Sequence, residues 1–314
     1  MSKSYADSYY SKKLCMWMDI STYCNAGCPE CHRTDIVKGG LKTIDWLPLI
    51  QWSVEDFKKR FEPQFIKNAC RKWEFCGTWG DPVMNKDLYK IVKYIVESNP
   101  STFVSIDTNG SIRGVNWWED LGKLSAATRH YGGGTIEVDF AVEGITQEMH
   151  SHYRRKTNLH KVLANMKAFT DNGGVATAFV VIHKHNQDHL HEIKELCELH
   201  GCSRFNFVES NRFEWHSTGD TGRFEFIDEN GAKQVLLQAD RTYSVPRENS
   251  QFHAPIADHK TRTDHNPIYK KDGKSYMDIQ KAVQAAASQL EGGDDVDQFI
   301  NCLLYTSDAA DEKV

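Results

Sequence analysis

The sequence contains no long hydrophobic run, since no uninterrupted apolar stretch approaches the roughly 18–20 residues of a membrane-spanning helix. It also has no excess of positive charge, because 38 Lys and Arg stand against 43 Asp and Glu. Non-specific nucleic-acid binding needs a basic face, so this balance argues against that class. The first 13 residues are polar and lack the apolar core of a signal peptide. We therefore expect a cytoplasmic protein with no membrane or nucleic-acid partner.

Cysteine is concentrated in one place. Three of the nine cysteines, Cys24, Cys28 and Cys31, lie within eight residues at the spacing C-x3-C-x2-C, and no fourth follows closely. In a chain without an export signal, such clustering indicates reduced thiols that bind metal. Three thiolates could hold three irons of a [4Fe–4S] cluster and leave the fourth iron open for a small molecule. A zinc site is the alternative, because zinc also favours clustered thiolates.

Short apolar runs alternate with amphipathic segments along the first two thirds of the chain. This alternation predicts parallel βαβ units with right-handed crossovers, arranged either as an open doubly wound sheet or as a barrel. One predicted helix spans residues 53–65, where a capping box begins it, and another carries apolar residues at i, i+3, i+4 and i+7 from Leu88. The six predicted strands are Leu14–Ile20, Lys72–Cys76, Thr102–Ile106, Thr135–Val142, Val175–Ile182 and Arg204–Val208.

The cysteine spacing resembles that of the radical S-adenosylmethionine (radical SAM) enzymes, and the resemblance extends from about residue 15 to residue 209. It implies an α/β fold, a partial (β/α)6 TIM-like barrel of parallel strands, with a [4Fe–4S] cluster and SAM as cofactors. In this family one electron from the cluster cleaves SAM to methionine and a 5′-deoxyadenosyl radical, which abstracts hydrogen from the substrate. The resemblance also implies a one-electron reductant of the flavodoxin or ferredoxin type. The substrate stays unidentified, with a peptide as one candidate.

The resemblance implies that SAM contacts lie at the carboxyl ends of the strands, where function collects in barrels of parallel strands. The segment from Gly77 to Pro82 is similar to the family's glycine-rich segment after the second strand, which binds the SAM amino group. Glycines let the backbone approach a ligand without a Cβ atom in the way. The implied metal ligands are Cys24, Cys28 and Cys31. The implied SAM contacts are Gly77, Thr78, Trp79, Gly80, Asp81, Thr108, Asn109, Asp139, Arg154 and Arg155.

The sequence departs from the family pattern at two positions. Glu30 stands before the third cysteine, where the family usually has an aromatic residue. A carboxylate beside the cluster adds negative charge, which tends to lower its potential. On the fourth strand Ala141 stands where the family has a serine. We therefore expect Asp139 or Glu143 to supply the polar side chain that the serine would provide.

Two further segments carry candidate side chains. Related enzymes have an arginine that pairs with the SAM carboxylate, and a guanidinium suits that bidentate contact. Arg154 and Arg155 are both candidates, and the sequence does not choose between them. His185 and His189 are spaced as metal ligands at i and i+4, but a strand end running into a helix with exposed histidines accounts for them better. Substrate contact from His183 or His185 stays open.

The alternation fades after residue 211. We expect a polar tail over 1–13, the radical SAM core over 14–211 and a C-terminal α+β extension over 212–301, with a late helix at Tyr276–Leu290. Residues 302–314 resemble a translated sequencing adapter, so we expect a non-native tail there. Twitch and SPASM members of the family bind auxiliary clusters in such an extension. No cysteine lies between residues 202 and 302, so we expect either a truncated extension or one without a cluster.

The resemblance therefore implies an enzyme that cleaves SAM reductively. Two alternatives stay open. A non-enzymatic iron–sulfur or zinc protein would give a metal spectrum that SAM leaves unchanged. A radical SAM activase that places a glycyl radical on a partner protein would need a large docking surface.

Overall fold

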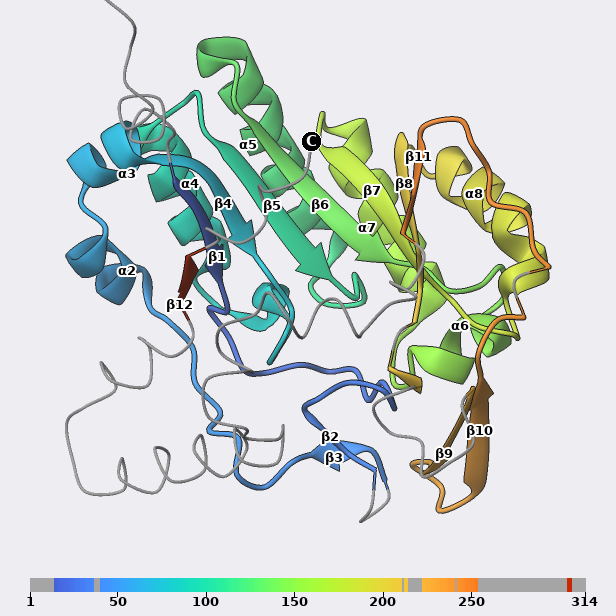
Figure 1. Ribbon diagram of the computed structural model, residues 1–314. Coiled ribbons are helices and arrows are strands. Elements are labelled where there is room, and N and C mark those ends of the chain that lie inside the picture. The colour runs from blue at the N-terminus through green and yellow to red at the C-terminus, as the bar shows by residue number, and fades with distance from the viewer. Residues whose placement is uncertain are drawn as a thin grey trace, which may run out of the picture.

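The centre of the fold is an eight-stranded sheet with the order β11-β8-β7-β6-β5-β4-β1-β12 (Figure 1). The computed structural model describes residues 14–36, 40–210, 212–213, 222–240, 242–253 and 304–306. Seven strands of the sheet run parallel, and β12 pairs antiparallel with β1 at one edge. Two small hairpins, β2–β3 and β9–β10, stand apart from the sheet.

The elements follow one another along the chain in the predicted alternation. The strands of the sheet are β1 (Leu14–Met18), β4 (Cys70–Phe75), β5 (Phe103–Thr108), β6 (Thr135–Ala141), β7 (Val175–Ile182), β8 (Arg204–Glu209), β11 (Ser250–His253) and β12 (Leu304–Thr306). The hairpins comprise β2 (Thr34–Asp35), β3 (Lys42–Thr43), β9 (Arg223–Ile227) and β10 (Lys233–Leu237). The helices are α2 (Val54–Arg60), α3 (Pro63–Ala69), η1 (Pro82–Met84), α4 (Leu88–Ser98), α5 (Val115–Gly132), α6 (Gln147–Tyr153), α7 (Leu159–Asp171), η2 (Gln187–His189) and α8 (Leu190–Leu199).

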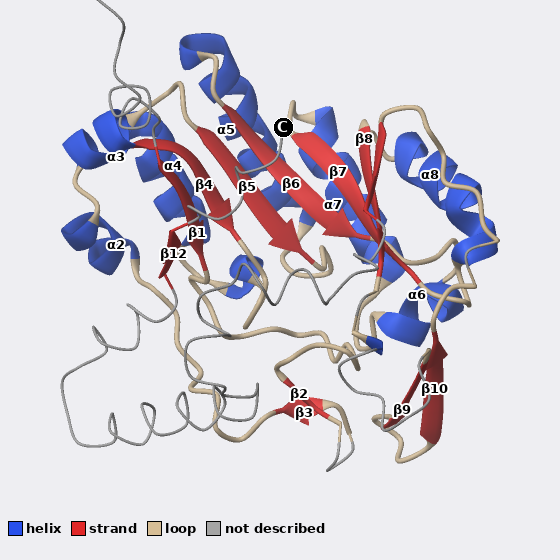
Figure 2. Ribbon diagram, viewed as in Figure 1, coloured by secondary structure: helices blue, strands red, loops and turns tan. Residues whose placement is uncertain are grey.

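Helices α4, α5 and α7 lie on one face of the sheet (Figure 2). A doubly wound sheet would carry helices on both faces, so the partial barrel is the correct one of the two predicted arrangements. The predicted fold class is confirmed, with β11 as a seventh parallel strand that comes from the C-terminal extension.

Each strand alternates between two environments. Side chains that face the helices are buried and apolar, as Trp73, Ile106 and Phe140 are. On β4, β5 and β6 most side chains on the concave face are polar, and Glu74 and Asp107 are half-buried there. One apolar face and one polar face produce the period of two in the sequence. The packing of the helix-covered face therefore stabilises the sheet, and the concave face is left for polar groups.

The single helix predicted over 53–65 is wrong in its extent, because two helices occupy this region. Ser53 begins α2 with the predicted capping box, but α2 ends at Arg60 and α3 begins at Pro63. Proline has no backbone N–H and is favoured at the first position of a helix. Pro63 thus begins a new helix instead of continuing the first.

The C-terminal extension is described only in part. Part of it forms the β9–β10 hairpin, which buries Phe224, Phe226 and Leu236. Those side chains pack against Cys28 and Tyr153, so the hairpin covers the loop that follows β1. The polar tail over 1–13, the late helix at Tyr276–Leu290 and most of the adapter-like segment lie outside the described residues.

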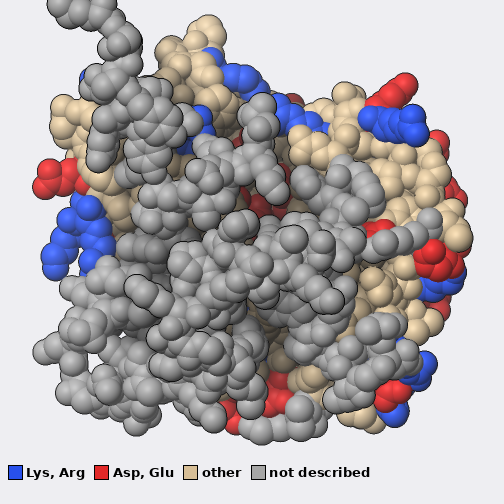
Figure 3. All heavy atoms as spheres, viewed as in Figure 1, with Lys and Arg blue, Asp and Glu red and all other residues tan. Residues whose placement is uncertain are grey.

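The described surface carries charges of both signs. On the face shown in Figure 3, basic and acidic side chains are interspersed around the rim. Among the described helices, none is both long enough and apolar enough to cross a membrane.

Candidate functional site

Cys24, Cys28 and Cys31 lie on the loop that leaves β1 and crosses the carboxyl ends of the parallel strands. Cys28 is buried, and the other two thiols are half-buried. The backbone turns tightly here, because the Cys31 N–H donates to the Cys28 carbonyl (3.1 Å) and the Thr34 N–H donates to the Cys31 carbonyl (2.9 Å). The turn gathers three sulfurs into one loop at the end of the sheet where parallel folds place their sites.

Hydrogen-bond donors surround two of the sulfurs. Cys24 Sγ accepts from the Ala26 N–H (3.4 Å) and from Asn109 Nδ2 (3.8 Å), and Cys28 Sγ accepts from Arg154 Nη1 (3.6 Å). Burial raises the pKa of the Cys24 thiol, and nearby Asp81 raises it further. Burial also raises the pKa of Cys28 to about 11, although Arg154 opposes that shift. Thiolates in such surroundings need the positive charge of a bound metal.

The cysteine loop supplies three thiols as potential metal ligands. Among the described residues, no three His, Cys, Asp or Glu side chains converge on one metal position. A structural zinc needs four ligands at about 2.0–2.3 Å from one ion. The thiolates of a [4Fe–4S] cluster each bind a different iron, so they need not converge. The donor set of three cysteines, two of which accept N–H hydrogen bonds at their sulfurs, therefore fits the cluster.

Asp81 joins the glycine-rich loop to the end of β5. Its carboxylate accepts from Thr108 Oγ1 (2.9 Å to each oxygen), the Asn109 N–H (2.8 Å), Asn109 Nδ2 (2.6 Å) and the Val83 N–H (2.9 Å). Burial raises the pKa of Asp81, and these bonds oppose the rise. The predicted residues Asp81, Thr108 and Asn109 are thus brought together, and Asp81 holds the other two in place.

Gly80 allows the glycine-rich loop to lie directly on the chain before Cys24. A Cβ atom built at Gly80 would lie 2.2 Å from the Ser21 carbonyl oxygen and 2.7 Å from the Thr22 backbone. A Cβ atom at Gly77 would meet its nearest neighbour, the Gly80 carbonyl oxygen, at 3.3 Å. Of these two glycines, Gly80 therefore lies closer to the neighbouring backbone, and no side chain fits there.

Trp79 is fixed at both its backbone groups. Its N–H donates to Asp19 Oδ1 (3.1 Å), and its carbonyl accepts from Arg33 Nε (3.1 Å). Its ring meets Trp46 edge-on at 5.6 Å between centroids. Thr78 is exposed, with its hydroxyl 3.9 Å from Cys76 Sγ. Of this pair, Trp79 is held rigidly and Thr78 is open to solvent.

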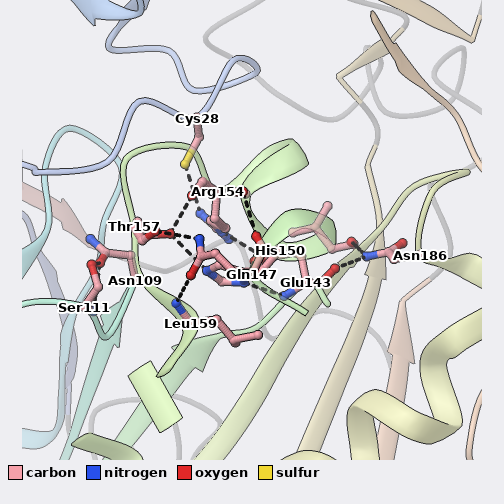
Figure 4. A network of polar contacts seen from close by, with 12 residues as sticks. Cys28, Asn109, Ser111, Glu143, Gln147, His150, Arg154, Thr157, Leu159 and Asn186 are labelled. Atoms are coloured by element: carbon pink, nitrogen blue, oxygen red, sulfur yellow. Dashed lines mark hydrogen bonds and ion pairs between the residues drawn. The ribbon is translucent and has the colours of Figure 1, made fainter. Parts of the chain in front are cut away.

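The two candidate arginines lie in different surroundings. Arg154 lies between Cys28 and Glu143, with Nε 2.8 Å from Glu143 Oε1 (Figure 4). Arg155 turns instead to the β9–β10 hairpin, where it pairs with Glu229 at 2.7 Å and Asp228 at 3.3 Å. Arg154 therefore contacts the cysteine loop, whereas Arg155 forms ion pairs with the hairpin.

A buried network around α6 fixes the backbone beside Arg154. His150 Nδ1 accepts from the Glu143 N–H (3.2 Å), and His150 Nε2 lies 3.0 Å from Thr157 Oγ1 (Figure 4). The Gln147 amide donates to the Thr157 carbonyl (3.0 Å) and accepts from the Leu159 N–H (2.8 Å). Burial lowers the pKa of His150 to about 3, so its ring is neutral and serves as an acceptor and donor.

Asp139 lies on the concave face rather than beside the cysteine loop. It stands directly across from Asp107 of β5 in the parallel register. Burial raises the pKa of Asp139 to about 6 and that of Asp107 to about 8, with Asp139 adding to the second shift. Glu143, the alternative to Asp139, is the one that contacts Arg154.

Asp107→Asn is expected to stabilise the protein increasingly as the pH rises. Because the native pKa of Asp107 is about 8 and the reference value is 3.8, the native state binds more protons than the unfolded state between these values, and stability falls as the pH rises through them. Asparagine does not ionise, so the variant does not lose stability in this pH range. Its thermal midpoint should exceed that of the wild type by roughly 3–5 °C at pH 8. Near pH 4 the two midpoints should differ little. An Asp120→Asn variant, on an exposed side chain, should show no such pH-dependent gap. A gap of constant size for Asp107→Asn would contradict the prediction.

Two residues of the site, Arg33 and Asn25, were not predicted from the sequence. Arg33 donates to the Trp79, Thr22 and Thr43 oxygens and so binds the glycine-rich loop to the cysteine loop. Asn25 accepts from Asn109 Nδ2 at 2.8 Å. The available signal was position alone, since Asn25 lies inside the cysteine motif and Arg33 two residues beyond it.

The candidate histidines have different partners, although the rings of His183 and His185 stack with centroids 5.5 Å apart. His183 is fully buried, with Nε2 3.1 Å from Glu30 Oε2. His185 packs beside His152, with ring centroids 4.5 Å apart, and His189 is exposed and pairs with Glu192. His185 and His189, the pair spaced as metal ligands, thus contact different residues.

Comparison with protein families gives a match to the family described as the radical SAM superfamily over residues 18–197, more than half of the chain. Comparison with curated protein sequences gives no match. Among solved structures, Streptococcus suis SuiB bound to S-adenosylmethionine is similar with a TM-score of 0.52 and 14% identity, over 78% of this chain and 51% of that one. SuiB bound to the precursor peptide SuiA is similar with a TM-score of 0.50 and 14% identity, over 67% and 42%. At this identity the likeness concerns the fold, and the chain spans about half the length of SuiB.

Proposed function

The chain belongs to the radical SAM superfamily, and we propose that Cys24, Cys28 and Cys31 each bind one iron of its [4Fe–4S] cluster. It is an enzyme whose cofactors are that cluster and SAM, and it needs an electron donor. When bound and reduced, the cluster supplies the electron that cleaves SAM to methionine and a 5′-deoxyadenosyl radical, which abstracts hydrogen from the substrate. The observation that carries the assignment is the cysteine loop at the end of β1, with N–H donors aimed at its sulfurs.

The SAM site in this proposal is built from the strand ends beside the cysteine loop. The close approach at Gly80 supports it, because the backbone from Gly77 to Asp81 is brought against the chain before Cys24. Asp81 acts by holding Thr108 and Asn109 in position, since its oxygens already accept hydrogen bonds from them. Asp139 lies further down the concave face, where a bound substrate would lie.

Arg154 is proposed to pair with the SAM carboxylate, and Arg155 is proposed to hold the hairpin. Arg154→Lys keeps the charge and loses the planar fork, so affinity for SAM should fall about tenfold or more, since a hydrogen bond to a charged group contributes about 1.5–3 kcal/mol. The matched Arg155→Lys variant should bind SAM as the wild type does. Titration of the reconstituted proteins with SAM measures both. An equal loss of SAM affinity in Arg154→Lys and Arg155→Lys would contradict this assignment.

The proposed electron donor is a protein of the flavodoxin or ferredoxin type, and the proposed substrate is a peptide. The peptide proposal is supported by the structural likeness to SuiB, a protein that was crystallised with its precursor peptide. A low-molecular-mass extract of the source organism should stimulate 5′-deoxyadenosine formation by the reconstituted enzyme. Prior digestion of the extract with a broad protease should remove the stimulation if the substrate is a peptide. If the digested extract still stimulates 5′-deoxyadenosine formation, the proposal of a peptide substrate is contradicted.

The proposed reaction is tested by anaerobic reconstitution. The purified chain should hold about four irons, and SAM should change the electron paramagnetic resonance spectrum of the reduced cluster. With SAM and dithionite it should then form 5′-deoxyadenosine. A chain that holds four irons and whose spectrum does not respond to SAM would contradict the proposal and favour a non-enzymatic iron–sulfur protein.

A further inference from the structure

Glu30, the residue directly before Cys31, has its side chain buried inside the protein, and the residue is 1% exposed. Its Oε2 accepts a hydrogen bond from Ser210 Oγ (2.8 Å) and lies 3.1 Å from His183 Nε2. Its backbone carbonyl accepts from the Arg212 guanidinium. A buried carboxylate is tolerated only when partners of this kind compensate for its lost hydration. The contacts from Ser210 and His183 therefore compensate for the hydration that the Glu30 carboxylate loses on burial.

The partners of Glu30 come from the far side of the sheet. His183 directly follows β7 and Ser210 directly follows β8, whereas the loop that carries Glu30 follows β1. Strands β4, β5 and β6 lie between β1 and β7 in the sheet. Glu30 thus connects the cysteine loop, across the mouth of the half-barrel, to the opposite end of the strand array.

His183 is a rigid partner. Its N–H donates to Asn186 Oδ1 (2.8 Å), and its carbonyl accepts from the Gln187 N–H (3.0 Å). Its ring packs against Tyr153 and Phe213, with centroids 4.6 and 5.8 Å away. A side chain held by its backbone and by two aromatic rings keeps the Glu30 carboxylate in one place.

We propose that Glu30 is a positioning residue that fixes the third cluster ligand, Cys31, through its contacts with His183 and Ser210. This inference rests on the proposed cluster site. Consecutive Cα atoms are about 3.8 Å apart, so anchoring Glu30 also anchors Cys31. The carboxylate adds negative charge beside the cluster, which disfavours addition of an electron. A phenylalanine at this position could accept neither hydrogen bond and would carry no charge.

The test compares Glu30→Ala with Glu30→Gln in the full, anaerobically reconstituted chain. An iron chelator should remove the cluster from Glu30→Ala about tenfold faster than from the wild type, as expected when an outer-sphere contact is lost. Glu30→Gln keeps an oxygen that accepts from Ser210 and His183, so its release rate should stay near that of the wild type. Its midpoint potential should be higher, because the charge is gone.

Glu209→Gln is the matched control, because Glu209 is a buried carboxylate at the end of β8 that accepts from Tyr243. It should leave the release rate and the potential unchanged. Equal release from Glu30→Ala and the wild type, or the same acceleration in Glu209→Gln, would overturn the role of Glu30. If Glu30→Ala does not fold, Ser210→Ala, which removes one of the hydrogen bonds to the Glu30 carboxylate, takes its place, and a release rate equal to that of the wild type overturns the role. A wild-type chain without four irons would overturn the proposed cluster site itself.

Discussion

The variant Cys24→Ala/Cys28→Ala/Cys31→Ala is expected to form no detectable 5′-deoxyadenosine under conditions in which the wild type does. Thiolates are the ligands that iron–sulfur clusters require, and alanine supplies none. Because cleavage of SAM draws its electron from the cluster, loss of the cluster should remove activity completely rather than in part. Iron content, the absorbance of the cluster and chromatographic detection of 5′-deoxyadenosine measure the effect.

The matched control for the triple variant is Cys197→Ala. Cys197 is a free thiol on α8, buried in the hydrophobic core on the helix-covered side of the sheet. Its replacement removes a thiol without touching the cysteine loop, so iron content and product formation should match those of the wild type. Residual product from the triple variant, or equal loss in Cys197→Ala, would contradict the assignment of the ligands.

Gly80→Ala is expected to destabilise the protein by about 3 kcal/mol, at the upper end of the usual range for overpacking. The new Cβ atom would lie 2.2 Å from the Ser21 carbonyl oxygen, and its other near neighbours are backbone atoms of Thr22. Backbone cannot rotate away as a long side chain can, so the glycine-rich loop must move. Chemical denaturation measures the loss of stability, and SAM binding by the reconstituted variant measures the displacement of the loop.

Gly114→Ala provides the control for this prediction. A Cβ atom at Gly114 would have no neighbour within 4 Å, and the φ of −100° is ordinary for any residue. The substitution should destabilise the protein by no more than about 1 kcal/mol, which is the usual cost of replacing a favoured N-cap residue, here Gly114, with alanine. A Gly80→Ala protein as stable as Gly114→Ala would show that the loop accommodates the methyl group.

Much of the fold followed from local sequence patterns. The short apolar runs and the amphipathic segments between them predicted parallel βαβ units, because strands that alternate with helices pair in parallel. The helix over 53–65 was misjudged, since its apolar pattern continued through Pro63 although the helix could not. The addition of β11 to the sheet was not predicted, because the alternation of apolar runs and amphipathic segments that marked the other parallel strands fades after residue 211.

The sequence by itself determined the chemistry of the site: three cysteines at short spacing, a glycine-rich loop after the next long strand, and polar residues at the strand after that. These features are local, so spacing along the chain was enough to find them. Only the tertiary structure separated Arg154 from Arg155, which are neighbours in sequence and point to different partners. It also turned Glu30 towards His183, 153 residues away. Such contacts depend on how the sheet curves and on which side chains meet across it, and no pattern along the chain records that.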